Sequence, residues 1–259
     1  YLNIEFMRKR ELVLIEAQGI YAITGPFHHY NDLAAYLVFI LGILLGTLVN
    51  QRKNFFLYIE FFLILFSLLF SYSRGGWLGF IFIIILLFIL TKKYKLLGLI
   101  SLLFLIGLFL IPSVKERFLF TFTSQGDSAR FLLWRYTLKI ISQNPFFGKG
   151  LGTYMDYFSK ASPLLEVQYA HNCFLQIWAE TGVFSLVSFF IFVFGIFLKA
   201  TKKFFITKDN LILALLLGIF GFFVHSFFDA HLYSLKLATL FWYNLGLLNA
   251  LINLDIKNN

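Results

Sequence analysis

The sequence predicts an all-α membrane protein, a polytopic transmembrane helical bundle with a large, partly helical outer loop. The first observation is composition: 59% of the 259 residues are hydrophobic and 14% are charged, whereas a soluble domain carries about a quarter charged residues. The second is the length of the apolar segments, several of which can cross a lipid bilayer. The third is a polar stretch, residues 112–172, that interrupts them. We therefore expect a protein embedded in lipid, with the polar stretch outside the bilayer.

Seven apolar segments are expected to form the spans. The first, residues 33–49, reaches roughly 25 Å at about 1.5 Å per residue, close to the roughly 30 Å hydrocarbon core of a bilayer. Short polar or basic tracts separate most of the segments from one another. The predicted spans are residues 33–49, 55–70, 77–90, 96–111, 182–198, 211–228 and 235–252.

The spans divide the chain into five parts. Because the chain begins at Tyr1 rather than at a methionine, we expect that further sequence precedes it. Asn31 or Asp32 is expected to cap the first helix. The expected parts are an outer-face segment (1–32), four spans (33–111), the large outer loop (112–172), three spans (173–252) and a cytoplasmic tail (253–259).

The distribution of basic residues sets the expected orientation. One set of short connections carries ten lysines and arginines and the other carries two, and the basic side of a membrane protein faces the cytoplasm. The segment 1–32, Arg74, the loop 112–172 and the turn 229–235 then share the outer face. Since many lysines lie in short tracts between apolar runs, the net charge of +9 does not indicate a nucleic-acid partner.

Three arginines on that face are candidates for binding a phosphate group. Arg74 lies between two spans and precedes Gly75 and Gly76, which would let an anion approach closely. Arg130 and Arg135 lie in the loop, about 140° apart around a predicted helix, so they are not expected to bind the same small group. The alternative for each arginine is contact with lipid headgroups or water.

The polar loop is expected to contain an amphipathic helix. Asp127 or Ser128 can cap its start, and Asn144-Pro145 would end it. The glycine-rich turn 148–152 follows and lacks the spacing of a phosphate-binding P-loop. We interpret this turn as a hinge.

Histidines supply the candidates for acid–base chemistry. His171 lies where the polar loop ends, and an imidazole that accepts a proton near neutral pH can act as a general base. The alternative is a structural hydrogen bond. His225 and Asp229 are four residues apart at the outer end of a span, so we expect them to share a helical face and to support the site or to pair structurally. Asn172 and Asn31 are further secondary candidates.

Neither a metal ion nor a cofactor is expected. His28, His29 and His231 are predicted to lie on the outer face, but their spacing matches no metal-binding motif. Cys173 is the only cysteine, which excludes an internal disulfide or a thiolate cluster within the sequence.

Four motifs follow one another along the predicted outer face. They are Gly25-Pro26-Phe27…Asn31, Ser73-Arg74-Gly75-Gly76-Trp77, Arg130…Trp134…Asn144-Pro145…Gly148-Lys149-Gly150, and His171-Asn172…Gln176…Glu180-Thr181-Gly182. In this order they resemble the superfamily of O-antigen ligases and O-antigen polymerases, which are bacterial polytopic membrane glycosyltransferases. The resemblance covers roughly residues 25–182. One departure is Tyr30, where many members have a proline. Members also usually have more spans upstream, so the resemblance implies further spans before Tyr1.

The resemblance implies a reaction and a location. Members of this type transfer a glycan from an undecaprenyl-pyrophosphate carrier to an acceptor hydroxyl during lipopolysaccharide biosynthesis, with inversion and without a metal. The site would lie on the periplasmic face of the bacterial inner (cytoplasmic) membrane. By their places in the motifs, Arg74 and Arg130 would bind the pyrophosphate, and His171 would be the catalytic residue.

The acceptor distinguishes three activities within that superfamily. A ligase transfers a finished chain to a lipid A core sugar, a polymerase extends the glycan chain itself, and a protein O-oligosaccharyltransferase modifies serine or threonine. We rank the first two ahead of the third. From another class, a transporter or flippase would place charges near the bilayer midplane, whereas only Glu60 lies well inside a span. A non-catalytic scaffold would tolerate the loss of Arg74 and His171.

Overall fold

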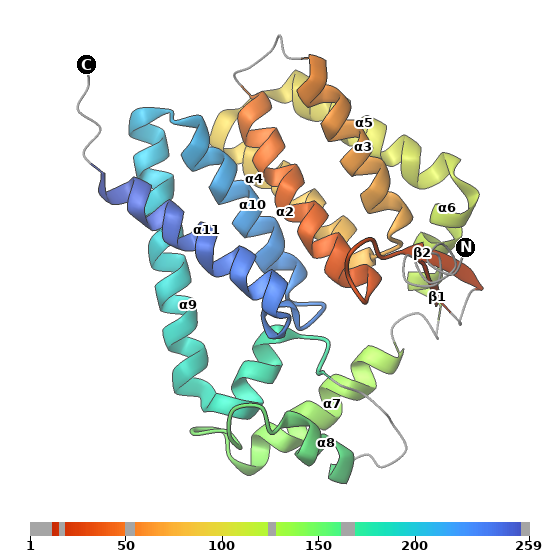
Figure 1. Ribbon diagram of the computed structural model, residues 1–259, viewed down its shortest axis with the longest axis vertical. Coiled ribbons are helices and arrows are strands. Elements are labelled where there is room, and N and C mark those ends of the chain that lie inside the picture. Colours follow the sequence, from red (N-terminus) through yellow and green to blue (C-terminus); the bar gives the residue numbers. More distant parts are fainter. Residues whose placement is uncertain (1–11, 16–18, 50–54, 124–127, 162–168, 255–259) are drawn as a thin grey trace, which may run out of the picture.

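The computed structural model describes residues 12–15, 19–49, 55–123, 128–161 and 169–254. Within them the chain forms ten α-helices, two short 3₁₀ helices and one β-hairpin (Figure 1). The predicted all-α, polytopic helical fold is therefore confirmed, with the hairpin as a small addition. The helices are α2 (Tyr30–Leu48), α3 (Phe55–Phe70), α4 (Arg74–Thr91), α5 (Tyr94–Leu110), α6 (Pro112–Leu119), η1 (Phe120–Phe122), α7 (Ser128–Gln143), α8 (Tyr154–Ala161), α9 (Cys173–Thr207), α10 (Asn210–His225), η2 (His231–Tyr233) and α11 (Leu235–Asn253).

Four helices of the described chain are long and apolar enough to cross a membrane, namely α2, α4, α9 and α11. Helices α5 and α6 form a fifth candidate, a pair bent by 91° just before Pro112. Helices α3 and α10 are apolar but have 16 residues each, which is roughly 24 Å of helix. Each predicted span thus overlaps a helix, although the segment 211–228 extends past the end of α10 and the segment 182–198 is only part of α9. The count of seven spans stays a prediction.

Small residues let α2 and α10 pack backbone to backbone in the middle of the bundle (Figure 1). A Cβ atom added at Gly42 would lie 2.4 Å from the backbone nitrogen of Gly218, and one at Gly46 would lie 2.3 Å from the Cα atom of Ala214. Close approach of this kind drives helix association in lipid, where burial of apolar surface contributes little between helices. The G-x-x-x-G spacing of α2 is therefore a structural feature of the bundle.

Replacing Gly42 by alanine is expected to lower the melting temperature of the detergent-solubilised protein. The added methyl group must push two backbones apart, and overpacking costs about 1–3 kcal/mol. Gly246→Ala in α11 is the matched control, because a Cβ atom there meets nothing within 4 Å and alanine favours helix. Tryptophan fluorescence during heating measures both variants. Equal melting temperatures would contradict the described contact between α2 and α10.

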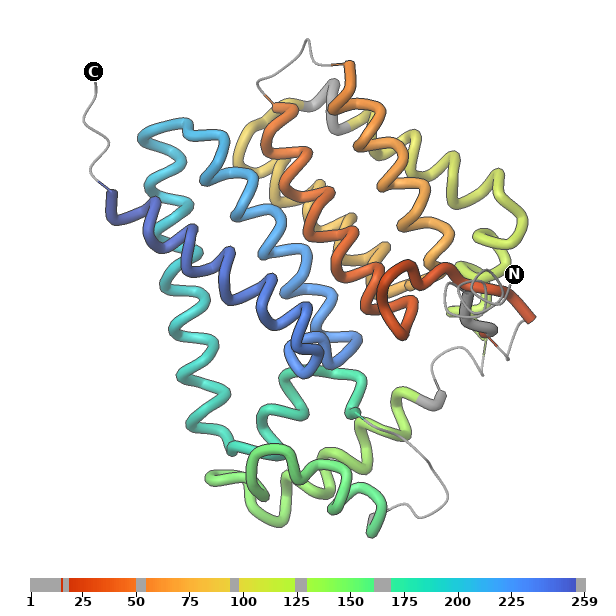
Figure 2. Tube along the Cα trace, viewed as in Figure 1, coloured from red at the N-terminus to blue at the C-terminus, as the bar shows by residue number. Residues whose placement is uncertain are grey.

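Helix α9 links the bundle to a second layer formed by α7 and α8. Its 35 residues run from that layer along the side of the bundle, as the turquoise and cyan tube in Figure 2 shows. The helix is kinked at Gly182, where φ is +83°. A Cβ atom at this position would lie 2.0 Å from the carbonyl oxygen of Phe146, so the kink requires glycine. The part of α9 before the kink packs on α7 and α8.

The glycine-rich turn after α7 holds this kink in place. The N–H of Lys149 donates to the carbonyl of Ala179 at 2.9 Å, and the N–H of Gly150 donates to the carbonyl of Glu180 at 2.8 Å. These carbonyls end the first part of α9 and would otherwise lack helical partners. From the sequence we interpreted this turn as a hinge. Its hydrogen bonds instead fasten the α7–α8 layer to α9.

The start of α2 differs from the sequence prediction. The N-cap residue is His29, whose Nδ1 atom accepts a hydrogen bond from the N–H of Asn31 at 3.2 Å. Burial lowers the pKa of His29, although the nearby carboxylates of Asp229 and Asp32 oppose this shift, and the neutral ring can accept that hydrogen bond. The expectation that Asn31 or Asp32 caps the helix is wrong, because the Asn31 side chain binds elsewhere.

A β-hairpin precedes α2 in the chain. Strand β1 (Leu12–Ile15) pairs antiparallel with β2 (Ile20–Ile23), with Leu12 opposite Ile23. Both strands are rich in branched aliphatic residues, which favour the extended conformation. The sequence pattern of residues 1–32 did not predict these strands.

Candidate active site

Two arginines from different helices line one cavity. Arg74 is the first residue of α4, and Arg130 lies in the first turn of α7. Both are partly buried, and the cavity between them has a volume of about 190 Å³. The Nη1 atom of Arg74 donates to Oγ1 of Thr121 at 3.2 Å. Two guanidinium groups thus line one cavity, and their planar donors suit the oxygens of a phosphate.

Neighbouring residues fix the backbone in front of Arg74. Ser73 caps α4, with its Oγ atom accepting a hydrogen bond from the N–H of Gly76 at 3.3 Å. Tyr72 has a φ of +53°, a left-handed conformation that costs a bulky residue about 1–3 kcal/mol. The buried Arg117 donates from Nε to the carbonyl of Tyr72 at 3.2 Å and holds this conformation. The arginine therefore projects from a rigid turn.

The two glycines after Arg74 serve helix packing. A Cβ atom at Gly75 would lie 2.7 Å from Cδ2 of His225, and one at Gly76 would lie 2.9 Å from Cβ of Ala34. The sequence predicts that these glycines allow the close approach of an anion; this role stays a prediction, and Gly75 does line the arginine cavity. In the structure both glycines also let the start of α4 pack against α10 and α2.

Arg135 lies on the same helix as Arg130 but apart from this cavity. Its side chain is exposed, and it does not belong to the cavity lining. The lining does include Trp134, one turn after Arg130. The predicted angular separation of the two arginines agrees with this placement, and the helix predicted to end near Asn144-Pro145 is confirmed as α7. Its predicted cap residue Asp127 lies outside the described residues.

His171 forms a pair with a buried carboxylate. Its Nδ1 atom lies 3.1 Å from Oδ1 of Asp229, and its side chain is 32% exposed. The other carboxylate oxygen of Asp229 accepts a hydrogen bond from Nδ2 of Asn31 at 2.5 Å, and Oδ1 also accepts from the N–H of Ala230 at 2.8 Å. With Nδ1 donating to Asp229, the Nε2 atom of the ring is the proton acceptor.

The surroundings of Asp229 keep its carboxylate ionised. Burial raises the pKa of this group, but the hydrogen bond with His171 and the electrostatic influence of the surrounding histidines outweigh burial. The net result is a pKa well below the usual range for aspartate. An ionised carboxylate at this place holds the imidazole in one tautomer and stabilises the imidazolium that forms when Nε2 takes a proton.

A chain of hydrogen bonds connects this pair with the arginine turn. The Oγ atom of Ser73 donates to Oδ1 of Asn31 at 2.8 Å, and the same asparagine donates to Asp229. Asp229 in turn binds His171. The residue before Arg74 and the candidate general base are thus joined through two buried side chains.

His225 lies at the end of its helix, as predicted, but it does not share a helical face with Asp229. Helix α10 ends at His225, and Asp229 lies in the turn that follows, so the two residues do not share a helical face. The predicted shared face and structural pair are wrong for this reason, whereas a role in supporting the site stays a prediction. The buried His225 instead places Nε2 3.3 Å from Oγ of Ser73 and packs its ring on His231 at a centroid distance of 4.3 Å. The contact with Ser73 places the His225 ring against the turn that precedes Arg74.

The backbone of His171 is strained and held from both sides. Its φ is +47°, in the left-handed region. Asn172 caps α9 by accepting hydrogen bonds from the N–H groups of Phe174 and Leu175, each at 3.0 Å. The indole N–H of Trp134 donates to the carbonyl of His171 at 3.4 Å. Since Trp134 also lines the arginine cavity, the histidine segment and that cavity are neighbours.

A comparison with known protein families gives a match that covers part of this site. A family model described as O-antigen ligase matches residues 59–190, just over half of the 259 residues. The chain belongs to the O-antigen ligase family. A comparison with curated proteins gives no match.

The part of this O-antigen ligase family protein that matches the family model includes Arg74, Arg130 and His171. Asn31 and Asp229, which orient the histidine, lie outside the matched range. The sequence did not reveal that Ser73 caps α4 or that Arg117 donates to the carbonyl of Tyr72. The position of Ser73 just before a helical run was the available signal, because serine is a preferred N-cap residue.

Proposed function

We propose that this protein is a membrane glycosyltransferase of the O-antigen ligase type. It transfers a glycan from an undecaprenyl-pyrophosphate carrier to an acceptor hydroxyl in lipopolysaccharide biosynthesis, on the periplasmic face of a bacterial inner membrane. The observation that carries this proposal is the cavity lined by Arg74 and Arg130, which adjoins the segment bearing His171. The family supports a role in the O-antigen pathway.

The two arginines act on the leaving group. As the bond between the anomeric carbon and the pyrophosphate oxygen breaks, its electron pair moves onto the pyrophosphate. Arg74 and Arg130 bind the growing negative charge through paired N–H donors. Because both side chains are partly buried, this attraction is stronger than it would be in bulk water.

His171 acts on the acceptor. Its Nε2 atom takes the proton of the acceptor hydroxyl while the hydroxyl oxygen bonds to the anomeric carbon from the face opposite the pyrophosphate. A single displacement of this kind inverts the configuration at that carbon. Asp229 stabilises the resulting imidazolium, which afterwards returns its proton to solvent.

The acceptor is identified by a product assay. Purified protein in nanodiscs receives an undecaprenyl-pyrophosphate-linked glycan together with lipid A core, a second donor unit or a serine-containing acceptor protein. We expect the glycan on lipid A core. A lengthened glycan on the carrier would assign polymerase activity instead, and a glycoprotein product would assign a protein O-oligosaccharyltransferase. An intact donor with all three acceptors would contradict the proposal.

Replacing Asp229 by asparagine is expected to lower kcat by roughly 10²-fold, because the imidazole loses the partner that sets its tautomer and orientation. The donor KM should stay near the wild-type value, since Asp229 is proposed to act through His171 and not on the pyrophosphate. Initial rates at varied donor concentration separate the two constants. Asp156→Asn in α8, where the side chain is exposed, is the matched control. A wild-type kcat for Asp229→Asn would remove Asp229 from the mechanism.

A further inference from the structure

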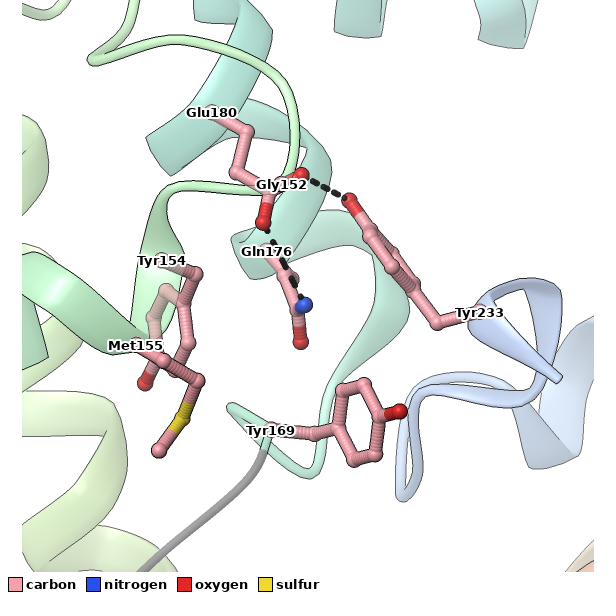
Figure 3. A pocket seen from close by; sticks show the side chains of 7 residues that line it. All are labelled: Gly152, Tyr154, Met155, Tyr169, Gln176, Glu180 and Tyr233. Atoms are coloured by element: carbon pink, nitrogen blue, oxygen red, sulfur yellow. Dashed lines mark hydrogen bonds between the residues drawn. The ribbon is translucent and has the colours of Figure 1, made fainter.

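A second cavity of about 330 Å³ lies next to the His171–Asp229 pair, between the first part of α9, α8 and η2. Tyr169 is two residues before His171, and Tyr233 is four residues after Asp229, so the segments that carry this pair also form the cavity wall. The mechanism proposed above leaves this cavity without a role. Its lining residues, shown in Figure 3, are Gly152, Tyr154, Met155, Tyr169, Gln176, Glu180 and Tyr233.

Polar groups that bind one another converge on this cavity. The hydroxyl of Tyr233 donates to Oε2 of Glu180 at 3.0 Å, and Nε2 of Gln176 donates to Oε1 of Glu180 at 3.5 Å (Figure 3). Burial, followed by the charge of Glu180, raises the pKa of Tyr233, so its phenol keeps the proton that it donates. Glu180 and Gln176 are each only 2% exposed. Their orientation is fixed before any ligand arrives.

These groups retain capacity for further hydrogen bonds. A carboxylate offers about four lone-pair positions and an amide offers two N–H donors. Within the described residues, the contacts above occupy two positions on Glu180 and one N–H of Gln176. The cavity therefore presents both acceptors and a donor to a ligand, which is the complement of a group that can donate and accept, such as a hydroxyl.

The charge of the cavity separates it from the arginine cavity. Its lining contains one carboxylate and, among the described residues, neither lysine nor arginine. A pyrophosphate would be repelled here and attracted to Arg74 and Arg130. A neutral ligand with many hydroxyls is suited to this place, and the ring of Tyr169, 39% exposed, offers an apolar face against which the C–H face of a sugar can pack.

We propose that this cavity is a carbohydrate-binding subsite that holds the acceptor sugar. Glu180 and Gln176 bind its hydroxyls, and Tyr169 packs against its ring. The hydroxyl to be glycosylated then lies near His171, with the pyrophosphate of the donor bound on the side of the arginines. The assignment to the acceptor rests on the proposed function, whereas the binding of a sugar does not.

Binding is tested directly with soluble probes. Delipidated lipid A core oligosaccharide and delipidated repeat-unit oligosaccharide are each titrated against the full chain in nanodiscs, with saturation-transfer NMR as the readout. We expect one of them to bind, and Tyr169→Ala and Glu180→Gln each to weaken its binding by about tenfold, the effect of losing one good contact. Tyr243→Ala, which removes a tyrosine that is 71% exposed on α11, should leave binding unchanged.

The outcomes separate this inference from the proposed function. Arg74→Lys should lower transfer without changing oligosaccharide binding, and Tyr169→Ala should raise the acceptor KM about tenfold at unchanged donor KM. Binding that Tyr169→Ala weakens, without transfer by the wild-type protein, would support the sugar site and refute the proposed function. If neither oligosaccharide binds, or if Tyr169→Ala and Glu180→Gln bind like the wild-type protein, the inference is overturned. A rise in donor KM alone would overturn the assignment to the acceptor.

Discussion

Replacing His171 by asparagine is expected to abolish measurable glycan transfer, with a loss of about 10²–10⁴-fold for a missing general base. Asparagine suits the test because it tolerates the left-handed conformation of this residue (φ +47°) and can still donate to Asp229. The variant therefore keeps the backbone and the hydrogen bond but lacks a proton acceptor of suitable basicity. Transfer by purified protein, with radiolabelled donor, measures the effect.

Two controls test whether the loss of transfer results from unfolding or from the removal of any histidine. The melting temperature of His171→Asn should match that of the wild-type protein, and His28→Ala, in which an exposed histidine before α2 is removed, should transfer normally. Transfer by His171→Asn at the wild-type rate would contradict the assignment of His171 as the general base.

Replacing either Arg74 or Arg130 by lysine is expected to lower kcat/KM for the donor by roughly 10–150-fold, since a hydrogen bond to a charged group contributes about 1.5–3 kcal/mol. Lysine keeps the positive charge but loses the planar pair of donors that a phosphate accepts. Steady-state kinetics with varied donor concentration measure the loss. Arg135→Lys on the exposed face of α7 is the matched control and should behave like the wild-type protein.

The double variant tests whether the two arginines share one ligand. If both bind the same pyrophosphate, the combined loss should differ from the sum of the single losses, because residues that contact one group are energetically coupled. Strictly additive losses would indicate two separate binding sites. A loss in Arg135→Lys equal to that in Arg130→Lys would contradict the assignment to the cavity.

Hydropathy predicted the helices well because a bilayer imposes a minimum length on each apolar segment. The predicted segment 55–70 has the same bounds as α3, and α11 ends one residue after its predicted end. The number of spans was harder to predict from the sequence. Helices α3 and α10 are shorter than a full crossing requires. A further helix, α6, follows α5 after a 91° bend at the place where the sequence predicted the end of a span.

The site was predictable as a set of residues but not as a geometry. Motif order and topology brought Arg74, Arg130 and His171 to one face, and the arginine cavity agrees with that expectation. The partner of His171 could not be derived, because Asp229 lies 58 residues away in the chain and pairs with it only where α10 has ended. Sequence spacing instead predicted that Asp229 pairs with His225, which assumed one more helical turn.

Two further features depend on tertiary packing alone. Gly75 is required by the side chain of His225 from another helix, a packing role that the sequence did not indicate. Glu180 and Tyr233 meet across 53 residues of chain, and no local pattern marks the cavity that they line. Such contacts are set by the way in which helices pack, and a single sequence carries no direct signal of them.

The transfer reaction itself is the most direct test of the proposed mechanism. Purified protein in nanodiscs is mixed with an undecaprenyl-pyrophosphate-linked glycan and lipid A core, and the products are analysed by mass spectrometry and NMR. The mechanism predicts one undecaprenyl pyrophosphate released for each glycan transferred, with inverted configuration at the new linkage and no product from His171→Asn. A retained configuration, or equal product from the wild-type protein and His171→Asn, would contradict it.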